Sequence, residues 1–274
     1  MTAIDWAGAD RQPCPDCGRG PKDRTCGVRH DERGGVAHCF RCGYVETDRA
    51  ESTTSRQREV LSRPGTPQAP IRHAGLSDFG ATLWRASGPL AGEALAYLQA
   101  RCCVIPPADG DLRWHAALKH SPSGLVGPAL VALVTDAVTC EPISLHRTWI
   151  RADGTKAPLD PPRMLLGGHR KAGGVVRLWP DEAVTLALGI AEGIETALSM
   201  ARHYTPVWSA IDAGNLGALP VLAGIEALVI GADHDAAGLD AATVCADRWV
   251  AAGVEVHVIA PEREGADWNG RPSA

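Results

Sequence analysis

The final third of the chain alternates between near-continuous apolar runs and stretches in which apolar residues recur at helical spacing. The apolar runs occupy residues 184–191, 206–211, 227–232 and 254–260. The helical patterns occupy residues 194–203, 215–224 and 237–253. Continuous apolar strands are typical of a sheet covered on both faces, and their alternation with helices predicts a parallel α/β sheet. In such a sheet functional groups gather at the carboxyl ends of the strands.

The middle of the chain, residues 73–180, has a different pattern. Apolar residues recur at helical spacing over residues 81–101, with an interruption at Gly88 and Pro89. Short β-branched or aromatic runs, bounded by turn residues, lie at residues 128–135, 143–150 and 175–179. We therefore expect an α+β subdomain dominated by antiparallel strands.

The N-terminal segment has too few apolar residues for a hydrophobic core. It carries instead two C-x-x-C pairs, Cys14 with Cys17 and Cys39 with Cys42, each followed by a glycine that suits a tight turn. Four thiolates satisfy tetrahedral zinc with no open position, so we expect one structural Zn²⁺ in place of the missing core. Residues 47–72, which are polar and rich in Ser, Thr and Pro, are typical of a flexible linker.

The surroundings of the predicted zinc site are cationic and aromatic. Cys26, His30 and His38 lie between the two pairs, and we interpret them as bystanders because four ligands are already present. The other residues of interest are Arg19, Lys22, Arg24, Arg29, Arg33, Arg41, Phe40 and Tyr44. Cations interleaved with aromatic rings suit single-stranded nucleic acid, whose bases stack on such rings. A solvated basic surface without a ligand is the alternative.

The net charge of −5 conceals an uneven distribution along the chain. Residues 1–75 have a balance of +2 and residues 76–180 a balance of +3, whereas residues 181–274 hold 4 Lys and Arg against 14 Asp and Glu. The first two thirds can supply a cationic surface for nucleic acid. The acidic third either repels nucleic acid or holds divalent cations.

The composition favours a protein of the cytoplasm without a membrane partner. No apolar run approaches the roughly 18–20 residues that span a bilayer, and the N-terminus lacks the basic start and apolar stretch of a signal peptide. The cysteine count is odd, at nine, and four of these residues lie in close pairs, which favours metal binding over disulfides.

Acidic residues follow two strands of the predicted parallel sheet. Glu192 comes directly after the first strand, and Asp233 and Asp235 come directly after the third. Alternate residues of an extended chain point the same way, so the two aspartates can hold one cation together. Oxygen ligands favour Mg²⁺ or Mn²⁺, and such a cluster suits phosphoryl transfer. The alternative is that these are ordinary acidic residues at helix N-termini, where the helix dipole favours them.

The segments EGIETALS and IGADHDAAG, which contain these acids, resemble the TOPRIM signature of bacterial primases, topoisomerases and some nucleases. The resemblance implies that Glu192 acts as a general acid or base and that Asp233 and Asp235 bind Mg²⁺ or Mn²⁺ together with it. It also implies that Asp267, in the sequence GADWN, is a further acidic ligand. Thr196 stands where many bacterial primases have another acidic residue.

The order of the segments resembles that of bacterial, phage and plasmid primases. It comprises a zinc ribbon (10–46), a linker (47–72), a basic α+β subdomain (73–180) and a TOPRIM domain with a parallel α/β sheet (181–274). The stretches WRASGPLAGEALAYLQAR, LHRTWIRADGTKA and RMLLGG resemble the region that precedes TOPRIM in phage and plasmid primase-like proteins. In that region Cys102 stands where the resemblance leads us to expect a glycine.

In primases the basic middle subdomain guides template and nucleotides toward the metals, and the resemblance implies candidates for this role. They are Arg147, Lys156, Arg163, Arg170, Lys171 and Arg177. We expect Arg147 and Lys156, on either side of the turn at Asp153 and Gly154, to face one groove. We also expect the glycine-bracketed residues 169–171 to form a flexible cationic loop suited to a triphosphate. The alternative for each cation is a solvated surface position.

The favoured hypothesis is a DNA primase that makes short RNA primers on a single-stranded DNA template from nucleoside triphosphates, by Mg-dependent nucleotidyl transfer. The sequence contains no G-x-x-x-x-G-K-[ST] motif, so any replicative helicase would be a separate partner. A TOPRIM-type nuclease using the same carboxylates is a second enzyme hypothesis. A non-catalytic recombination mediator like the RecR clamp is the binding hypothesis, although that clamp has closer Cys pairs and no middle subdomain.

Overall fold

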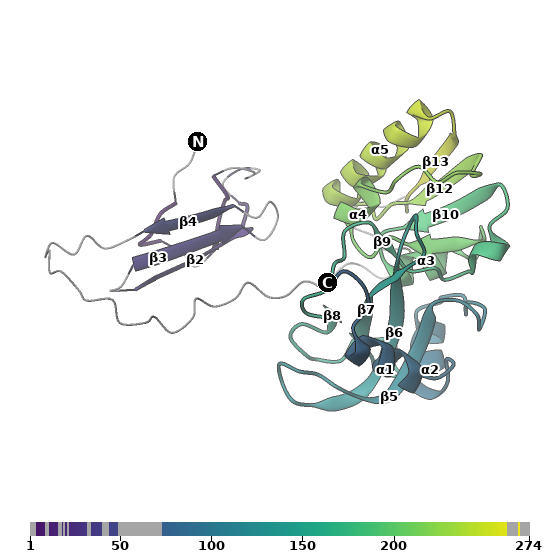
Figure 1. Cartoon of the computed structure of the whole chain (residues 1–274), viewed down its shortest axis with the longest axis horizontal. Helices are drawn as coiled ribbons and strands as arrows, with labels where there is room; N and C mark the ends of the chain where they lie inside the picture. Colours follow the sequence, from purple (N-terminus) through teal and green to yellow (C-terminus); the bar gives the residue numbers. More distant parts are fainter. Residues whose placement is uncertain are drawn as a thin grey trace, which may run out of the picture. The chain divides into compact units, whose positions relative to one another are not determined.

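The computed structural model describes residues 4–8, 11–15, 18, 20, 22–31, 34–39, 44–48, 73–261 and 268. The chain divides into two compact units, Met1–Thr66 and Pro67–Ala274 (Figure 1). Within the described residues, no helix is both long enough and apolar enough to cross a membrane.

The first unit is a small antiparallel sheet of four strands in the order β1-β2-β3-β4. The strands are β1 (Arg11–Gln12), β2 (Cys26–Asp31), β3 (Gly34–Cys39) and β4 (Val45–Asp48). Among the described residues of this unit, the buried apolar cluster contains Cys14, Cys26 and Cys39 together with Ile4, Val28 and Ala37, and Trp6 and Tyr44 pack against it. Half of the buried residues in this cluster are therefore cysteines.

The first half of the second unit is an antiparallel sheet, as predicted. Its strands are β5 (Leu112–Lys119), β6 (Val126–Asp136), β7 (Pro142–Trp149) and β8 (Arg163–Leu165), and β9 (Gly174–Val175) pairs with β6. The strand expected at 175–179 is only the two-residue β9. The sequence did not reveal β5 or β8, because β5 has a register shift between His115 and Leu118 and β8 is three residues long.

Two helices cover opposite faces of this antiparallel sheet. They are α1 (Asp78–Ala86) and α2 (Gly92–Ala100), and the break between them falls at the predicted Gly88–Pro89. Leu83 of α1 packs with Leu145 and Trp149 on one face, whereas Tyr97 and Leu98 of α2 pack with Leu130 on the other.

The backbone conformation at the end of α2 explains why a glycine is expected at position 102. Cys102 has a φ of 55°, in the left-handed region that favours glycine. The turn places Cys103 inward, where its Sγ lies 3.6 Å from Ser199 Oγ. A cysteine therefore occupies a position whose backbone geometry suits glycine.

The second half of the unit is a parallel sheet in the order β11-β10-β12-β13, and this confirms the predicted fold class. Its strands are β10 (Ala187–Ala191), β11 (Val207–Ser209), β12 (Ala227–Gly231) and β13 (Glu255–Ile259). Leu188 and Ile190 of β10 face one core cluster and Ala191 faces the other, which is why the strand has a continuous apolar sequence.

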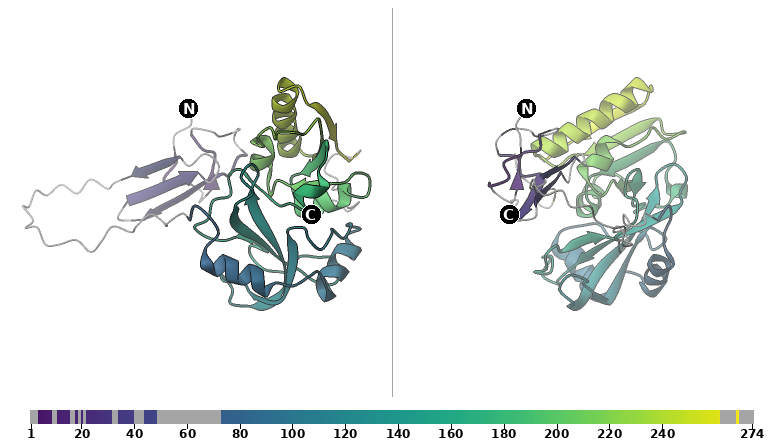
Figure 2. Two further views of the ribbon diagram at one scale, coloured as in Figure 1. Left: turned by 45° about the vertical axis from the view of Figure 1, so that its right-hand side comes forward. Right: turned by 60° about the vertical axis from the view of Figure 1, so that its left-hand side comes forward.

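Helices cover both faces of this parallel sheet (Figure 2). The helix α3 (Ile194–Met200) belongs to the core cluster that also contains α2 and β6, so the two halves of the unit share one core. On the other face lie α4 (Ala213–Gly217) and α5 (Ala236–Ala251), and the short 3-10 helix η1 (Asp181–Ala183) precedes β10. The helix expected over 215–224 is therefore shorter, ending at Gly217 ahead of the helix-breaking Pro220.

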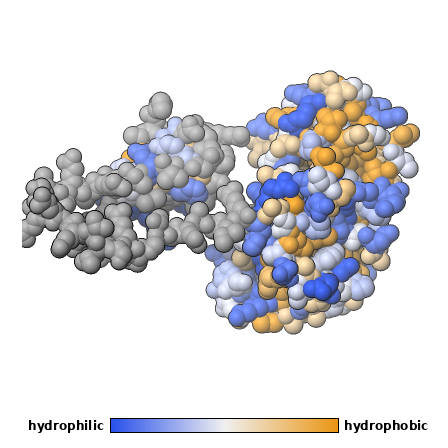
Figure 3. Space-filling model, viewed as in Figure 1, coloured by the Kyte–Doolittle hydropathy of each residue, from blue (hydrophilic) through white to orange (hydrophobic). Residues whose placement is uncertain are grey.

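The outer surface of the parallel half retains exposed apolar side chains. Val244 and Val250 of α5 and Val258 of β13 are exposed, and hydrophobic residues are visible over this part of the molecule in Figure 3. Single exposed valines are ordinary on a protein surface.

Candidate active site

Glu192 lies at the carboxyl end of β10, at the edge of the sheet where the other acidic residues also gather. Its main-chain carbonyl accepts a hydrogen bond from Ser209 Oγ at 3.1 Å, which fixes the turn into α3. Burial raises the pKa of the Glu192 carboxyl to about 7, and the negative charges of Asp233, Asp235 and Asp212 add to this effect. A carboxyl with a pKa near neutrality can both accept and release a proton.

Asp233 and Asp235 follow β12, and each already has a protein partner. Asp233 Oδ1 accepts from Thr196 Oγ1 at 3.2 Å. Asp235 is the N-cap of α5 and accepts from the Gly238 main-chain N–H at 2.7 Å. The helix-terminus interpretation therefore holds for Asp235, but the effect on Glu192 shows that its charge also reaches the acidic cluster. Gly238 is required here because a Cβ atom would lie 2.7 Å from the Asp233 carbonyl oxygen.

Asp212 is a fourth acid at this edge, and the sequence analysis missed it. It follows β11, caps α4 by accepting from Asn215 N at 3.0 Å, and forms an ion pair with Lys171 Nζ at 2.6 Å. The same reasoning that found Glu192 would have found it, since Asp212 directly follows the predicted strand 206–211.

The chemistry of this edge fits a divalent cation. Burial and, after it, the negative charges of three aspartates raise the pKa of Glu192, and carboxylate oxygens are the ligands that Mg²⁺ and Mn²⁺ prefer. Across the described part of the chain, no group of three or more His, Cys, Asp or Glu side chains is already arranged as a metal cage. Asp267 lies outside the described residues. Its neighbour Trp268 donates from Nε1 to the carbonyl of Ala232, directly before Asp233, at 3.0 Å.

Glu195, three residues after Glu192, has neighbours that stabilise its negative charge. It is buried, accepts a hydrogen bond from Tyr97 Oη at 2.7 Å and has Lys156 Nζ at 3.8 Å. Burial alone would raise the pKa of Glu195, but the Lys156 ammonium and the Tyr97 hydroxyl hold it at about 2. Glu195 thus ties α3 to α2 and to the loop after β7, and it stabilises the junction between the two halves of the unit.

Arg147 and Lys156 do not face one groove, contrary to expectation. Arg147 lies opposite Val131 on β6 and Met164 on β8, both of which pack on the α1 side of the antiparallel sheet. Lys156 reaches Glu195 on the α2 and α3 side. Lys156 lies in the loop after β7, where it pairs with Ile150 in an isolated bridge and reaches Glu195, so the two cations lie on different sides of the sheet.

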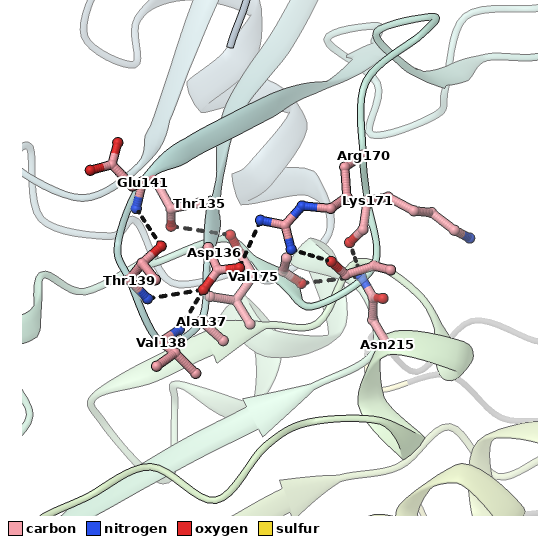
Figure 4. A network of polar contacts seen from close by, with 12 residues as sticks. Thr135, Asp136, Ala137, Val138, Thr139, Glu141, Arg170, Lys171, Val175 and Asn215 are labelled. Atoms are coloured by element: carbon pink, nitrogen blue, oxygen red, sulfur yellow. Dashed lines mark hydrogen bonds and ion pairs between the residues drawn. The ribbon is translucent and has the colours of Figure 1, made fainter. Parts of the chain in front are cut away.

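The cationic loop after β8 is held by its own partners (Figure 4). Arg170 Nη2 donates to Asp136 Oδ2 at 2.7 Å, and the Asn215 side chain donates to the carbonyls of Lys171 and Gly174 at 2.9 and 3.1 Å. Arg163, at the start of β8, is exposed. Of the predicted cations, Lys171 lies nearest to the acidic edge because it pairs with Asp212.

Two of the four predicted zinc ligands, Cys17 and Cys42, lie outside the described residues. Cys14 and Cys39 are buried in the core of the first unit together with Cys26. The Gly18 main-chain N–H donates to the Cys14 carbonyl at 2.9 Å, and a Cβ at Gly18 would lie 2.4 Å from that oxygen. The glycine after the first pair is therefore required by a tight turn, as predicted.

Both halves of the second unit match known protein-family models. Residues 187–273 match the Toprim domain. The parallel half of this unit is a Toprim domain. Residues 74–178, just ahead of it, match a domain of unknown function (DUF7146). The Toprim match confirms the domain class that the two acidic motifs predict.

The solved structures similar to this chain include three primases. A primase domain from Pseudomonas aeruginosa has 12% identity and a TM-score of 0.46, with 71% of this chain and 73% of that chain covered. The DnaG catalytic core has 15% identity and a TM-score of 0.47, with 70% and 72% covered. The zinc-binding and RNA polymerase domains of the Aquifex aeolicus primase have 18% identity and a TM-score of 0.43, with 70% and 55% covered. No curated protein matches the chain.

Proposed function

We propose that this protein is a DNA primase, which synthesises short RNA primers on single-stranded DNA by Mg-dependent nucleotidyl transfer. The observation that carries the proposal is the cluster of Glu192, Asp233 and Asp235 at the carboxyl edge of a Toprim sheet, with the pKa of Glu192 raised to about 7. The order of the segments, with a cysteine-rich unit and a basic subdomain ahead of Toprim, favours a primase over other Toprim proteins.

Glu192 would act as the general base of the reaction. Its pKa is about 7 in the metal-free protein, and a bound cation would lower it, so its carboxylate would be ionised at neutral pH and able to take the proton of an attacking 3′-hydroxyl. Asp233, Asp235 and Asp267 would hold Mg²⁺ or Mn²⁺ together with Glu192. When bound, the cation supplies charge that stabilises the attacking and leaving oxygens of the transfer.

Of the remaining predicted residues, Lys171 would bring substrate to this edge, and the other cations would bind nucleic acid or nucleotide elsewhere on the basic subdomain. Lys171, which pairs with Asp212, would meet the phosphates of a nucleoside triphosphate. Lys156, Arg163, Arg170 and Arg147 remain candidates for binding nucleic acid or nucleotide. Cys14, Cys17, Cys39 and Cys42 would hold a structural Zn²⁺ in a template-binding ribbon. A separate replicative helicase and a cytoplasmic location complete the proposal.

The test is synthesis of oligonucleotides from labelled nucleoside triphosphates on single-stranded DNA with Mg²⁺ or Mn²⁺. Short products should form with the wild type and with Asp247→Asn, a control on the exposed surface of α5 in the same domain. They should be lost in Glu192→Gln and Asp233→Asn. Products that persist in both variants would show that the carboxylate edge is not the catalytic centre.

Two other outcomes would replace the proposal. Metal-dependent cleavage of the template without synthesis, lost in the same two variants, would identify a Toprim nuclease. Binding of DNA without synthesis or cleavage would identify a non-catalytic mediator of the kind that the zinc and Toprim combination also allows.

A further inference from the structure

A pocket of about 530 Å³ opens on the face of the antiparallel sheet that α1 covers. Its walls are apolar and include Leu83 of α1 and Leu118 of β5, with Phe79 at the rim. Two cations, Lys119 and Arg147, also line it, and no acidic residue is among the described residues that do so. This is the α1 side of the sheet, which faces away from the Toprim half (Figure 1).

Arg147 is the unusual member of this pocket. It is only 5% exposed, its Nη2 donates to the Leu165 carbonyl at 2.8 Å, and its Nε is buried without a hydrogen-bond partner. Within the described residues no carboxylate pairs with it, and burial lowers the pKa of its guanidinium. A buried charge without a counter-ion is costly, so a missing anion is the simplest explanation for its place.

Arg177 shows how this protein treats another buried guanidinium. Arg177 is 6% exposed and forms an ion pair with Asp181 at 2.7 Å. Its two terminal nitrogens donate to Thr135 Oγ1 and to the carbonyls of Asp136 and Ala137. Arg147 has no such set of partners, although its burial is the same.

The residues at the rim of the pocket indicate which kind of molecule carries the anionic group. The Phe79 side chain is 67% exposed and presents an aromatic ring on which a flat group can stack. A volume of about 530 Å³ lies within the range of small-molecule sites and suits a mononucleotide better than a bare inorganic anion. Lys119 beside the opening adds a second positive charge.

We propose that this pocket binds a nucleotide, with the phosphate at Arg147 and the base stacked on Phe79. The same chemistry is offered by a free mononucleotide and by the 5′-phosphorylated end of a nucleic-acid strand. The site is separate from the carboxylate edge, and the proposal does not depend on the proposed primase activity.

Isothermal titration of the full chain, without added divalent cation, tests the pocket with four probes. Three are small molecules, namely adenosine monophosphate, adenosine and inorganic phosphate, and the fourth is a short oligonucleotide, which is titrated in two forms, with and without a 5′-phosphate. Adenosine monophosphate should bind more tightly than adenosine or phosphate alone. Tighter binding of the 5′-phosphorylated than of the unphosphorylated oligonucleotide would identify a strand end as the source, and its absence a free nucleotide.

Three variants locate the binding. Arg147→Met should weaken nucleotide binding by roughly tenfold or more, because a charge-assisted contact is lost. Phe79→Ala should weaken it by roughly tenfold through lost stacking, and its exposure means that the fold is not at risk. The Arg147 guanidinium lies 5.6 Å from the centre of the Trp149 ring, and that of Arg113 lies 4.1 Å from the centre of the Trp84 ring. Arg113→Met is the matched control, because Arg113 also donates to a main-chain carbonyl but does not line the pocket.

Thermal denaturation of the free proteins guards against a folding artefact. Arg147→Met should melt no lower than the wild type, since it removes a buried unpaired charge. Absence of nucleotide binding to the wild type would overturn the proposal. So would equal affinities of Arg147→Met and Arg113→Met, or phosphate binding as tightly as the nucleotide.

Discussion

Two glutamates three residues apart in the sequence have opposite electrostatic environments. Burial of Glu192, at the carboxyl edge of the parallel sheet, raises its pKa to about 7, and the negative charges of three nearby aspartates add to this effect. Glu195, at the junction with the antiparallel half, has Lys156 and Tyr97 as partners, and its pKa is lowered to about 2. The same type of side chain therefore has a raised pKa at one position and a lowered pKa at the other, because its surroundings differ.

The largest expected effect is on activity, and it distinguishes Glu192 from Glu195. Glu192→Gln should reduce primer synthesis about 100-fold or more, because a general base is removed while the shape is kept. Circular dichroism should show an unchanged fold. Incorporation of labelled nucleotide measures the effect, and synthesis at the wild-type rate would remove Glu192 from the chemistry.

Glu195→Gln should have its main effect on stability. Removing one partner of a buried ion pair leaves Lys156 without its counter-ion, and we expect the free energy of unfolding to fall by about 3 kcal/mol. Urea denaturation measures the loss. Adding Lys156→Met to Glu195→Gln should recover part of it, whereas a loss below about 1 kcal/mol would show that the pair is as weak as a surface salt bridge.

The two glutamates should also give opposite pH dependence of stability. The raised pKa of Glu192 means that ionisation destabilises the fold, so this cost is absent below the ordinary pKa of 4.5 and complete above about 7. The lowered pKa of Glu195 means that its stabilisation is complete above 4.5 and is lost as the pH falls toward about 2.

Melting temperatures over this pH range test both statements. Compared with Glu192→Gln, the wild type should lose stability as the pH rises from about 4.5 to 7. Compared with Glu195→Gln, it should lose its advantage as the pH falls below 4.5. Parallel curves for the wild type and Glu192→Gln would contradict the acidic environment of Glu192.

Tyr97→Phe is a milder change at the same junction. It removes only the 2.7 Å hydrogen bond to Glu195 and should lower the free energy of unfolding by about 2 kcal/mol, as for a hydrogen bond to a charged group. Primer synthesis should be unchanged once the protein is folded. A large loss of activity at unchanged stability would instead place Tyr97 in the reaction.

The smallest effect concerns the turn that brings Cys103 beside Glu195, with Cys103 Sγ 3.6 Å from the Glu195 carbonyl oxygen. Cys102→Gly should raise the free energy of unfolding by about 1 kcal/mol, because a side chain in the left-handed conformation is relieved. Urea denaturation measures the change. Cys102→Ala is the control, and it should give no gain because it keeps the Cβ atom.

The sequence by itself determined the architecture of the Toprim half. Continuous apolar strands, helical spacing between them and acidic residues directly after the strands are local features. They can be recognised without knowing which other segments of the chain pack against them. The break at Gly88–Pro89 and the tight turn at Gly18 are local for the same reason. A further acid, Asp212, was within reach of the same rule.

Only the tertiary structure decided what each polar residue does. The distinction between Glu192 and Glu195 depends on Lys156 and Tyr97, which come from distant parts of the chain. The separation of Arg147 from Lys156 depends on which face of the antiparallel sheet each side chain occupies. Charge interactions act through space with a strength set by burial, so residue type and spacing in the sequence cannot supply them.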